Sequence, residues 1–289
     1  MRPVLSRLVA GCQRRTTSVG KDIWQNTAVT WNSYVAVGDS FTEGIGDTPT
    51  HDGLRHRGWA DRLAQALHQE AASTGGTQFG YANFAIRGRT LPPIINDQLP
   101  QALSLSPDLV SITGGINDAM RPRFDLDRTA NLLESGVVAA RETGADVLLV
   151  GFGEPSRRSR PFSLIADRLR DYRGQILRIA DTHDCYLLDP WHETQFDDPR
   201  FWAPDRLHLN ALGHERIAYA AMESLGLAAP DWHEPLPDAP RPSLMTDIRS
   251  TADWSVRYLA PWIARRILRR SSGDGLAAKR PTLMPVHPD

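Results

Sequence analysis

Five short apolar runs, each followed by a turn or a loop, constrain this chain more than any other sequence feature. They cover residues 34–37, 79–84, 109–113, 147–152 and 185–188. Helical hydrophobic spacing follows at 58–73, 126–142, 164–181 and 211–225. Strands that alternate with helices indicate right-handed βαβ units and a parallel sheet covered on both faces. We therefore expect a flavodoxin-like three-layer α/β/α sandwich with a five-stranded parallel sheet.

Composition divides the 289 residues into three predicted regions. A basic tail at 1–30, expected to be poorly ordered, precedes an α/β domain at 31–229, and a proline-rich linker with an amphipathic helix follows at 230–289. Residues 31–230 carry 19 basic and 26 acidic side chains, a net charge of −7. A nucleic-acid-binding domain needs a basic footprint, so we expect no nucleic-acid partner.

The predicted C-terminal helix, residues 245–270, is basic, with six arginines against two aspartates. One interpretation is a helix that lies on a membrane surface. The other is a helix that packs on the acidic domain near the mouth of its ligand site. The short linker and the complementary charges favour the second interpretation. The sequence predicts no particular oligomeric state.

Metal, cofactor and membrane signals are weak in this chain. Cys12 and Cys185 are too far apart for a disulfide framework or a zinc set, and His-Glu-x-x-His is absent, so we expect no metal and no cofactor. No run approaches the roughly 18 apolar residues of a membrane span. Arg7 interrupts the apolar run near the N-terminus, which disfavours a signal peptide. We expect a cytoplasmic protein, with secretion or lipid anchoring less favoured.

Two motifs could together form a nucleophilic site. Ser40 lies directly after the first predicted strand, in the sequence Gly-Asp-Ser-Phe-Thr-Glu-Gly. A serine is inert without a base, and alone this one would be assigned to a helix cap. Asp205 and His208 precede the last predicted helix at a spacing that lets the carboxylate hold the imidazole. Taken alone, that pair fits a surface turn equally well.

Two further loops could supply hydrogen bonds to a developing oxyanion. Asn117 lies in Gly-Gly-Ile-Asn-Asp after the third strand, where its amide could donate. Gly88 lies in Asn-Phe-Ala-Ile-Arg-Gly-Arg-Thr after the second strand and could present its backbone N–H. Each loop also has a plain structural explanation as a cap or a turn. It is improbable that all four motifs occur together by chance, so their joint occurrence favours a catalytic site.

These motifs, in this order over about residues 34–228, resemble the SGNH hydrolase superfamily, which includes the GDSL-like esterases and lipases. One departure is Ala85, where many relatives have a second glycine. The resemblance implies metal-free ester hydrolysis on a flavodoxin-like fold. It implies a catalytic triad of Ser40, Asp205 and His208, and an oxyanion hole formed by Ser40, Gly88 and Asn117. The α/β-hydrolase motif Gly-x-Ser-x-Gly is absent, because Thr42 stands at its second glycine.

The substrate is expected to be a small-molecule ester, most simply a short-chain acyl or acetyl ester, including acetylated carbohydrates. Trp191 and Trp202 flank the segment before Asp205 and could stack on a sugar or shape an acyl pocket; loop packing explains them equally well. A lipase, a thioesterase or an acyltransferase on the same triad is the alternative. From another class, the chain could be a non-catalytic binding module that retains the fold.

Overall fold

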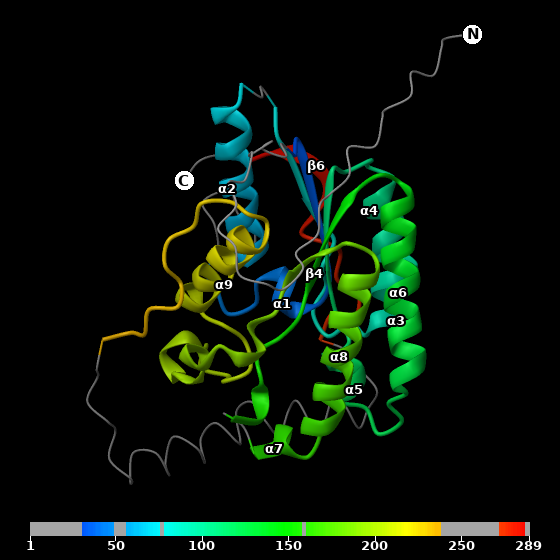
Figure 1. Ribbon diagram of the computed structural model, residues 1–289, viewed down its shortest axis with the longest axis vertical. Coiled ribbons are helices and arrows are strands. Elements are labelled where there is room, and N and C mark those ends of the chain that lie inside the picture. The colour runs from blue at the N-terminus through cyan, green and yellow to red at the C-terminus, as the bar shows by residue number, and fades with distance from the viewer. Residues whose placement is uncertain (1–30, 49–55, 76–77, 158–159, 238–271, 287–289) are drawn as a thin grey trace, which may run out of the picture.

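The structure is a computed structural model that describes residues 31–48, 56–75, 78–157, 160–237 and 272–286. A six-stranded sheet in the order β5-β4-β3-β1-β2-β6 forms its centre, with helices on both faces (Figure 1). Strands β1 to β5 pair in parallel, and their order matches a flavodoxin-like doubly wound sheet. The predicted fold class is confirmed.

The five parallel strands form where the apolar runs predicted them. Strand β3, near the middle of the sheet, is buried along its whole length, because helices cover both of its faces. Predicted and observed bounds differ by at most two residues at either end. The strands are β1 (Ser33–Val37), β2 (Gly80–Asn83), β3 (Leu109–Thr113), β4 (Asp146–Val150) and β5 (Tyr186–Leu188).

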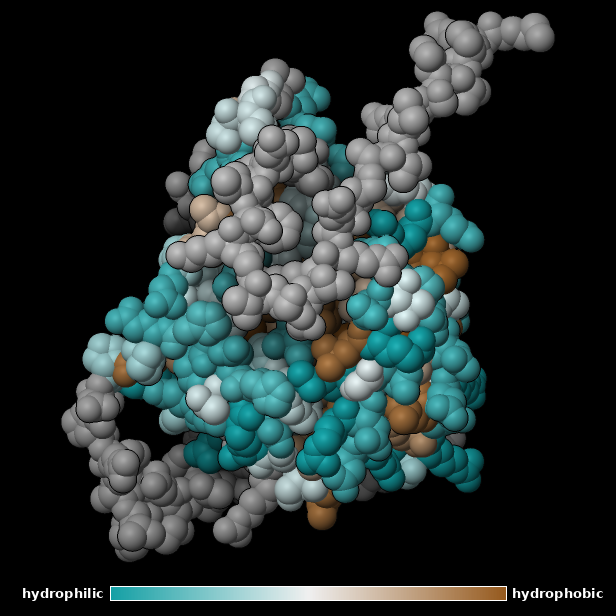
Figure 2. Space-filling model, in the orientation of Figure 1, coloured by the Kyte–Doolittle hydropathy of each residue, from teal (hydrophilic) through white to brown (hydrophobic). Residues whose placement is uncertain are grey.

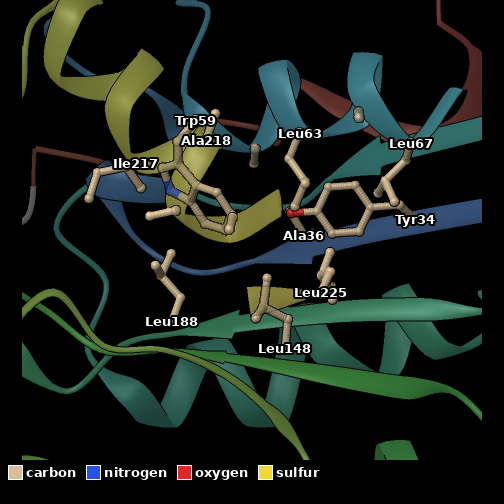
Figure 3. Close-up of a cluster of buried hydrophobic side chains, with 14 of the residues drawn as sticks. Tyr34, Ala36, Trp59, Leu63, Leu67, Leu148, Leu188, Ile217, Ala218 and Leu225 are labelled. Atoms are coloured by element: carbon tan, nitrogen blue, oxygen red, sulfur yellow. The ribbon is translucent and has the colours of Figure 1, made fainter. Parts of the chain in front are cut away.

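Helices α2 (Trp59–Ser73) and α9 (Ala211–Ser224) cover one face of the sheet. In Figure 3, Leu63 of α2 lies beside Tyr34 of β1. Trp59 of α2 lies beside Ile217 of α9 in the same buried cluster. The Tyr34 hydroxyl is 2.8 Å from Ser111 Oγ on the neighbouring strand β3, which gives each buried hydroxyl a hydrogen-bond partner.

The opposite face is covered by α6 (Leu126–Glu142), α8 (Ala166–Thr182) and a helical segment at residues 91–103. That segment consists of α3 (Leu91–Pro93), the π-helical turn η1 (Ile94–Gln98) and α4 (Leu99–Leu103). Sequence analysis predicts no helix in this segment. Its prolines interrupt the usual pattern. Pro92 stands in the first turn of α3, where the missing N–H removes no helical hydrogen bond. Pro100 lies just after η1, whose last hydrogen bond runs from the Leu99 N–H to the Ile94 carbonyl.

Single helical turns lie in the loops that follow the strands. These are α1 (Ser40–Glu43), α5 (Ile116–Ala119), η2 (Pro155–Arg157), α7 (Arg160–Ser163), η3 (Pro190–His192), η4 (Thr194–Asp197) and η5 (Pro199–Phe201).

The sixth strand corrects the prediction of five. The prediction for 230–289 is a linker with an amphipathic helix, but β6 (Arg280–Pro285) pairs antiparallel with β2 (Figure 1). Buried Arg280 fastens this edge, because its guanidinium donates to the carbonyls of Tyr81, Met284 and Pro285. The strand has no alternating apolar pattern, since one of its faces is held by a charged side chain rather than by a hydrophobic row.

Some predictions fall outside the described residues, namely the basic tail at 1–30 and the amphipathic helix at 245–270 with its two interpretations. The described face in Figure 2 is mostly hydrophilic, with separate brown patches. None of the described helices is long and apolar enough to cross a membrane.

Candidate active site

Ser40 opens the single-turn helix α1 at the carboxyl end of β1. The Asp39 carboxylate caps this turn by accepting a hydrogen bond from the backbone N–H of Phe41 at 3.1 Å. Gly44 ends the turn in a left-handed conformation, with φ of 93°. The turn therefore presents the Ser40 side chain, half-buried, at the edge where ligands bind in such sheets.

Asp205, His208 and Ser40 form one hydrogen-bonded series. His208 Nδ1 lies 2.6 Å from Asp205 Oδ2, and His208 Nε2 lies 2.9 Å from Ser40 Oγ. The other Asp205 oxygen accepts the backbone N–H groups of Leu207 and His208, both at 3.0 Å. These contacts fix the loop before α9, so that one proton on Nδ1 leaves Nε2 able to accept the serine proton.

The Asp205 carboxyl has a pKa below its usual value. Burial raises this pKa, but the hydrogen bonds and charge of His208 and the backbone N–H groups of His208 and Leu207 together outweigh burial. Asp205 is therefore ionised near neutral pH. An ionised carboxylate only accepts hydrogen bonds, which places the shared proton on His208 Nδ1.

The loop after β2 brings Gly88 toward the same edge. Gly88 has φ of 72°, a left-handed conformation that favours glycine. The buried Glu43 carboxylate anchors this loop by accepting the Arg87 backbone N–H at 2.6 Å and pairing with the Arg87 guanidinium. Within the described residues, the backbone N–H groups of Ser40 and Gly88 donate no hydrogen bond. Both could therefore donate to a ligand oxygen.

Asn117 differs from those two groups, because its amide already has acceptors. Its Nδ2 donates to Asp39 Oδ2 at 3.0 Å and to the Arg89 carbonyl at 2.9 Å. To serve an oxyanion, Asn117 must share or exchange one of these hydrogen bonds. A charged oxygen is a stronger acceptor than a neutral carbonyl, so exchange with Arg89 is the easier route.

Two supporting residues were missed by the sequence prediction. Gln98, in the π-helical turn η1, accepts from the Gly38 N–H at 2.8 Å and donates to the Gly38 carbonyl at 3.0 Å. Asn83 donates to the Thr42 carbonyl at 3.0 Å from the end of β2. A polar residue at a strand end was a usable signal for Asn83. Nothing local marked Gln98, because its partner is 60 residues away in the chain.

The two tryptophans have different surroundings. Trp191 is 4% exposed, packs edge-on against Phe152 and lies 5.6 Å below the Arg173 guanidinium. This position gives Trp191 the packing role that sequence analysis left open beside substrate contact. Trp202 is half-buried, and its indole N–H donates to the Phe196 carbonyl at 2.8 Å, which fixes the ring beside the loop that carries His208.

No group of three or more histidine, cysteine, aspartate or glutamate side chains in the described parts of the chain could hold a metal ion. The site instead combines a hydroxyl, an imidazole and a carboxylate with backbone N–H groups. That set can transfer a proton from serine to histidine and stabilise a negative oxygen, which is the chemistry of acyl transfer.

A doubly wound sheet with this constellation at its carboxyl edge defines the class of ester hydrolases. The chain belongs to the GDSL-like Lipase/Acylhydrolase family, whose model matches residues 36–216.

Solved structures share its fold. One is LAE5, an α/β hydrolase enzyme from the metagenome of Lake Arreo, Spain, with 24% identity, coverage of 68% of this chain and 95% of that chain, and a TM-score of 0.55. Another is a catalytic mutant of Axe2, an acetylxylan esterase from Geobacillus stearothermophilus, with 20% identity, coverage of 70% and 95%, and a TM-score of 0.56. A search of curated protein sequences finds no match.

Proposed function

We propose that this ester hydrolase is a serine esterase that acts through an acyl-enzyme on Ser40. The observation that carries the proposal is the continuous series from Asp205 through His208 to Ser40, with distances of 2.6 and 2.9 Å. His208 Nε2 takes the Ser40 proton as Oγ attacks the ester carbonyl. His208 then protonates the leaving alcohol, and a water activated by the same nitrogen releases the acid.

The oxyanion of the tetrahedral intermediate is held by the Ser40 and Gly88 N–H groups, with Asn117 as a third donor. Donors already fixed by the fold stabilise this charge without reorganisation during the reaction. Asp205 keeps the imidazole in the required tautomer and stabilises its charged form.

A fluorophosphonate probe and one substitution test this mechanism. We expect covalent labelling at Ser40, and a fall of about 10⁴-fold in kcat for Ser40→Ala with a p-nitrophenyl ester. Ser33→Ala, at the opposite end of β1, is the matched control and should retain activity. A label mapped to another serine would overturn the assignment. Absence of all turnover would favour a non-catalytic binding module.

The substrates we propose are short-chain acyl or acetyl esters, including those of carbohydrates. A fold shared with an acetylxylan esterase supports this, as do the short connections of the described domain, which carry no inserted cap domain. A panel of esters of graded acyl length, with acetylated xylo-oligosaccharides included, tests it. Highest kcat/KM on acetate esters is expected. A maximum at long acyl chains or thioesters would instead indicate a lipase or a thioesterase, and ester synthesis in the presence of alcohols would indicate an acyltransferase.

A further inference from the structure

The C-terminal segment, residues 272–286, does more than close the sheet edge. Before it pairs as β6, it passes the loops that carry Ser40 and Gly88. Three of its residues contact these loops or their neighbours: Gly273, Asp274 and Lys279. Segments more than 180 residues apart in the chain therefore meet at the candidate active site.

Lys279 joins the end of α1 to the start of α2. Its ammonium donates to the Glu43 carbonyl at 2.8 Å, the His56 carbonyl at 2.9 Å and Asp61 Oδ2 at 2.5 Å. The side chain is 6% exposed and that of Asp61 is 9% exposed, so the ion pair is buried. A lysine ammonium has three donors, and here each has an acceptor.

The contact with Glu43 links Lys279 to both halves of the site. Glu43 ends α1, a single turn that begins with Ser40, so a shift at one end moves the other. The Glu43 carboxylate also holds the N–H of Arg87, the residue before Gly88. One residue therefore connects the nucleophile turn to the loop that presents the second oxyanion donor.

Gly273 contacts this second loop directly. A Cβ atom on Gly273 would lie 2.2 Å from the Arg87 carbonyl oxygen and 2.7 Å from Ile86 Cγ2. Only glycine allows such a close backbone approach. The next residue, Asp274, has a carboxylate 3.7 Å from the Arg89 guanidinium. The segment thus packs against both sides of Gly88.

We propose that Lys279 and Gly273 are positioning residues for ester hydrolysis, and that through these two residues the C-terminal segment supports the active site. The proposal rests on the roles proposed above for Ser40 and Gly88. Lys279 holds the end of the nucleophile turn, and Gly273 supports the loop that aims the Gly88 N–H. The Ser40 and Gly88 N–H groups both donate to the oxyanion in the proposed mechanism. Displacing these N–H groups therefore lowers kcat more than it changes KM.

Adjacent buried cations provide a matched pair of variants. Lys279→Met removes the hydrogen bond to the end of α1 and the ion pair with Asp61, whereas Arg280→Met removes contacts with the edge of β2 and with β6 itself. We expect Lys279→Met to lower kcat on p-nitrophenyl acetate and the rate of Ser40 labelling by at least about 10-fold, with KM within about twofold, since small misplacements of reacting groups have large effects. Arg280→Met should lower Tm with kcat within about twofold of the parent.

A second pair keeps the proposal testable if Lys279→Met does not fold. Gly273→Ala pushes on the Arg87 carbonyl, whereas Gly275→Ala strains a left-handed position that has no atom within 4 Å of a new Cβ. We expect kcat to fall for Gly273→Ala only. The inference is overturned if kcat falls in proportion to Tm in all four variants. It is also overturned if neither Lys279→Met nor Gly273→Ala lowers kcat. A parent protein whose Ser40 is unlabelled and that is inactive on every ester overturns the proposed function instead.

Discussion

At the residue scale, Asp39 combines two duties in a buried position. One oxygen caps α1, and the other accepts the Asn117 amide at 3.0 Å. Burial raises the pKa of the Asp39 carboxyl to about 6, although the hydrogen bonds from Phe41 and Asn117 and the charge of His208 oppose that rise. The charged form that orients Asn117 is therefore destabilising near neutral pH.

We predict that Asp39→Asn makes the protein more stable and less active at pH 8. Asparagine still caps a helix, so α1 keeps its N-terminal hydrogen bond. The raised pKa corresponds to about 1–3 kcal/mol of lost stability above pH 6, which the neutral side chain recovers. Since this pKa is raised in the folded state, the gain in unfolding free energy from Asp39→Asn should shrink toward zero as pH falls from 6 to 4. Urea unfolding of both proteins across this range measures the difference.

The activity of the Asp39→Asn variant tests whether Asp39 orients Asn117. Asparagine offers Asn117 an amide nitrogen or a single oxygen in place of a carboxylate, so we expect kcat to fall with KM little changed. A variant that is as active as the parent, or that is less stable at pH 8, would contradict this account of Asp39.

At the element scale, a histidine joins α9 to the elements that follow β1. His214 is fully buried; its Nδ1 accepts the Trp59 N–H at 3.3 Å, and its Nε2 donates to the Ile45 carbonyl at 3.1 Å. One nitrogen accepts and the other donates, so the imidazole is neutral. The contact fixes the start of α2 and the turn after α1 against α9, whose preceding loop carries His208.

We predict that His214 makes folding sensitive to acid. Burial, with the nearby Lys279 and Arg62, lowers its pKa to about 4, although the Ile45 carbonyl and Asp47 oppose this. Because the folded-state pKa lies below the unfolded value of about 6.5, neutral His214 favours the folded protein above pH 6.5. This stability is lost as pH falls from 6.5 toward 4, by about 2–3 kcal/mol in all. His214→Gln, which keeps one donor and one acceptor, should give a flatter stability curve between pH 6.5 and 4.5. Parallel urea-midpoint curves for the two proteins would refute this prediction.

At the scale of the whole molecule, the segment at 272–286 completes the sheet with β6 and brings two buried cations against the domain. Arg280 lies over the Tyr81 ring at 5.2 Å, and Lys279 neutralises the buried Asp61. A sheet edge without this cover would expose unpaired backbone groups of β2. The last described segment is thus integral to the α/β sandwich rather than an appendage.

We predict that a chain ended at residue 271 is markedly less stable. Removing one partner of a buried ion pair costs about 3–5 kcal/mol, because the other charge is left uncompensated. For a domain of this size, that corresponds to a fall in Tm on the order of 10 °C. Met284→Ala, at a side chain that is 49% exposed, is the control and should change Tm little. An unchanged Tm in the truncated protein would show that β6 contributes no net stability.

Local sequence patterns were sufficient for the parallel sheet and for the residues gathered at its edge. The bounds of β3 and α6 agree with the prediction to the residue. A strand buried on both faces appears in the sequence as a short apolar run, and a helix with one buried face appears as apolar residues at helical spacing. Motifs directly after strands had to converge, since the carboxyl ends of parallel strands share one edge. Ser40 follows β1, and His208 lies in the loop from β5 to α9 at the same edge, so that these residues, 168 positions apart, meet at 2.9 Å.

Features that depend on distant partners were decided by tertiary structure alone. The pairing of β6 with β2, the burial of Trp191 and the Gln98 contacts with Gly38 leave no periodic signal, because each is set by a surface formed elsewhere in the chain. The Lys279 contact with Glu43 spans 236 positions. Sequence by itself therefore determined the five parallel strands, the long helices between them and which motifs gather at the edge of the sheet. Packing determined what holds those side chains in place, because a long-range contact is stabilised only after the chain has folded around it.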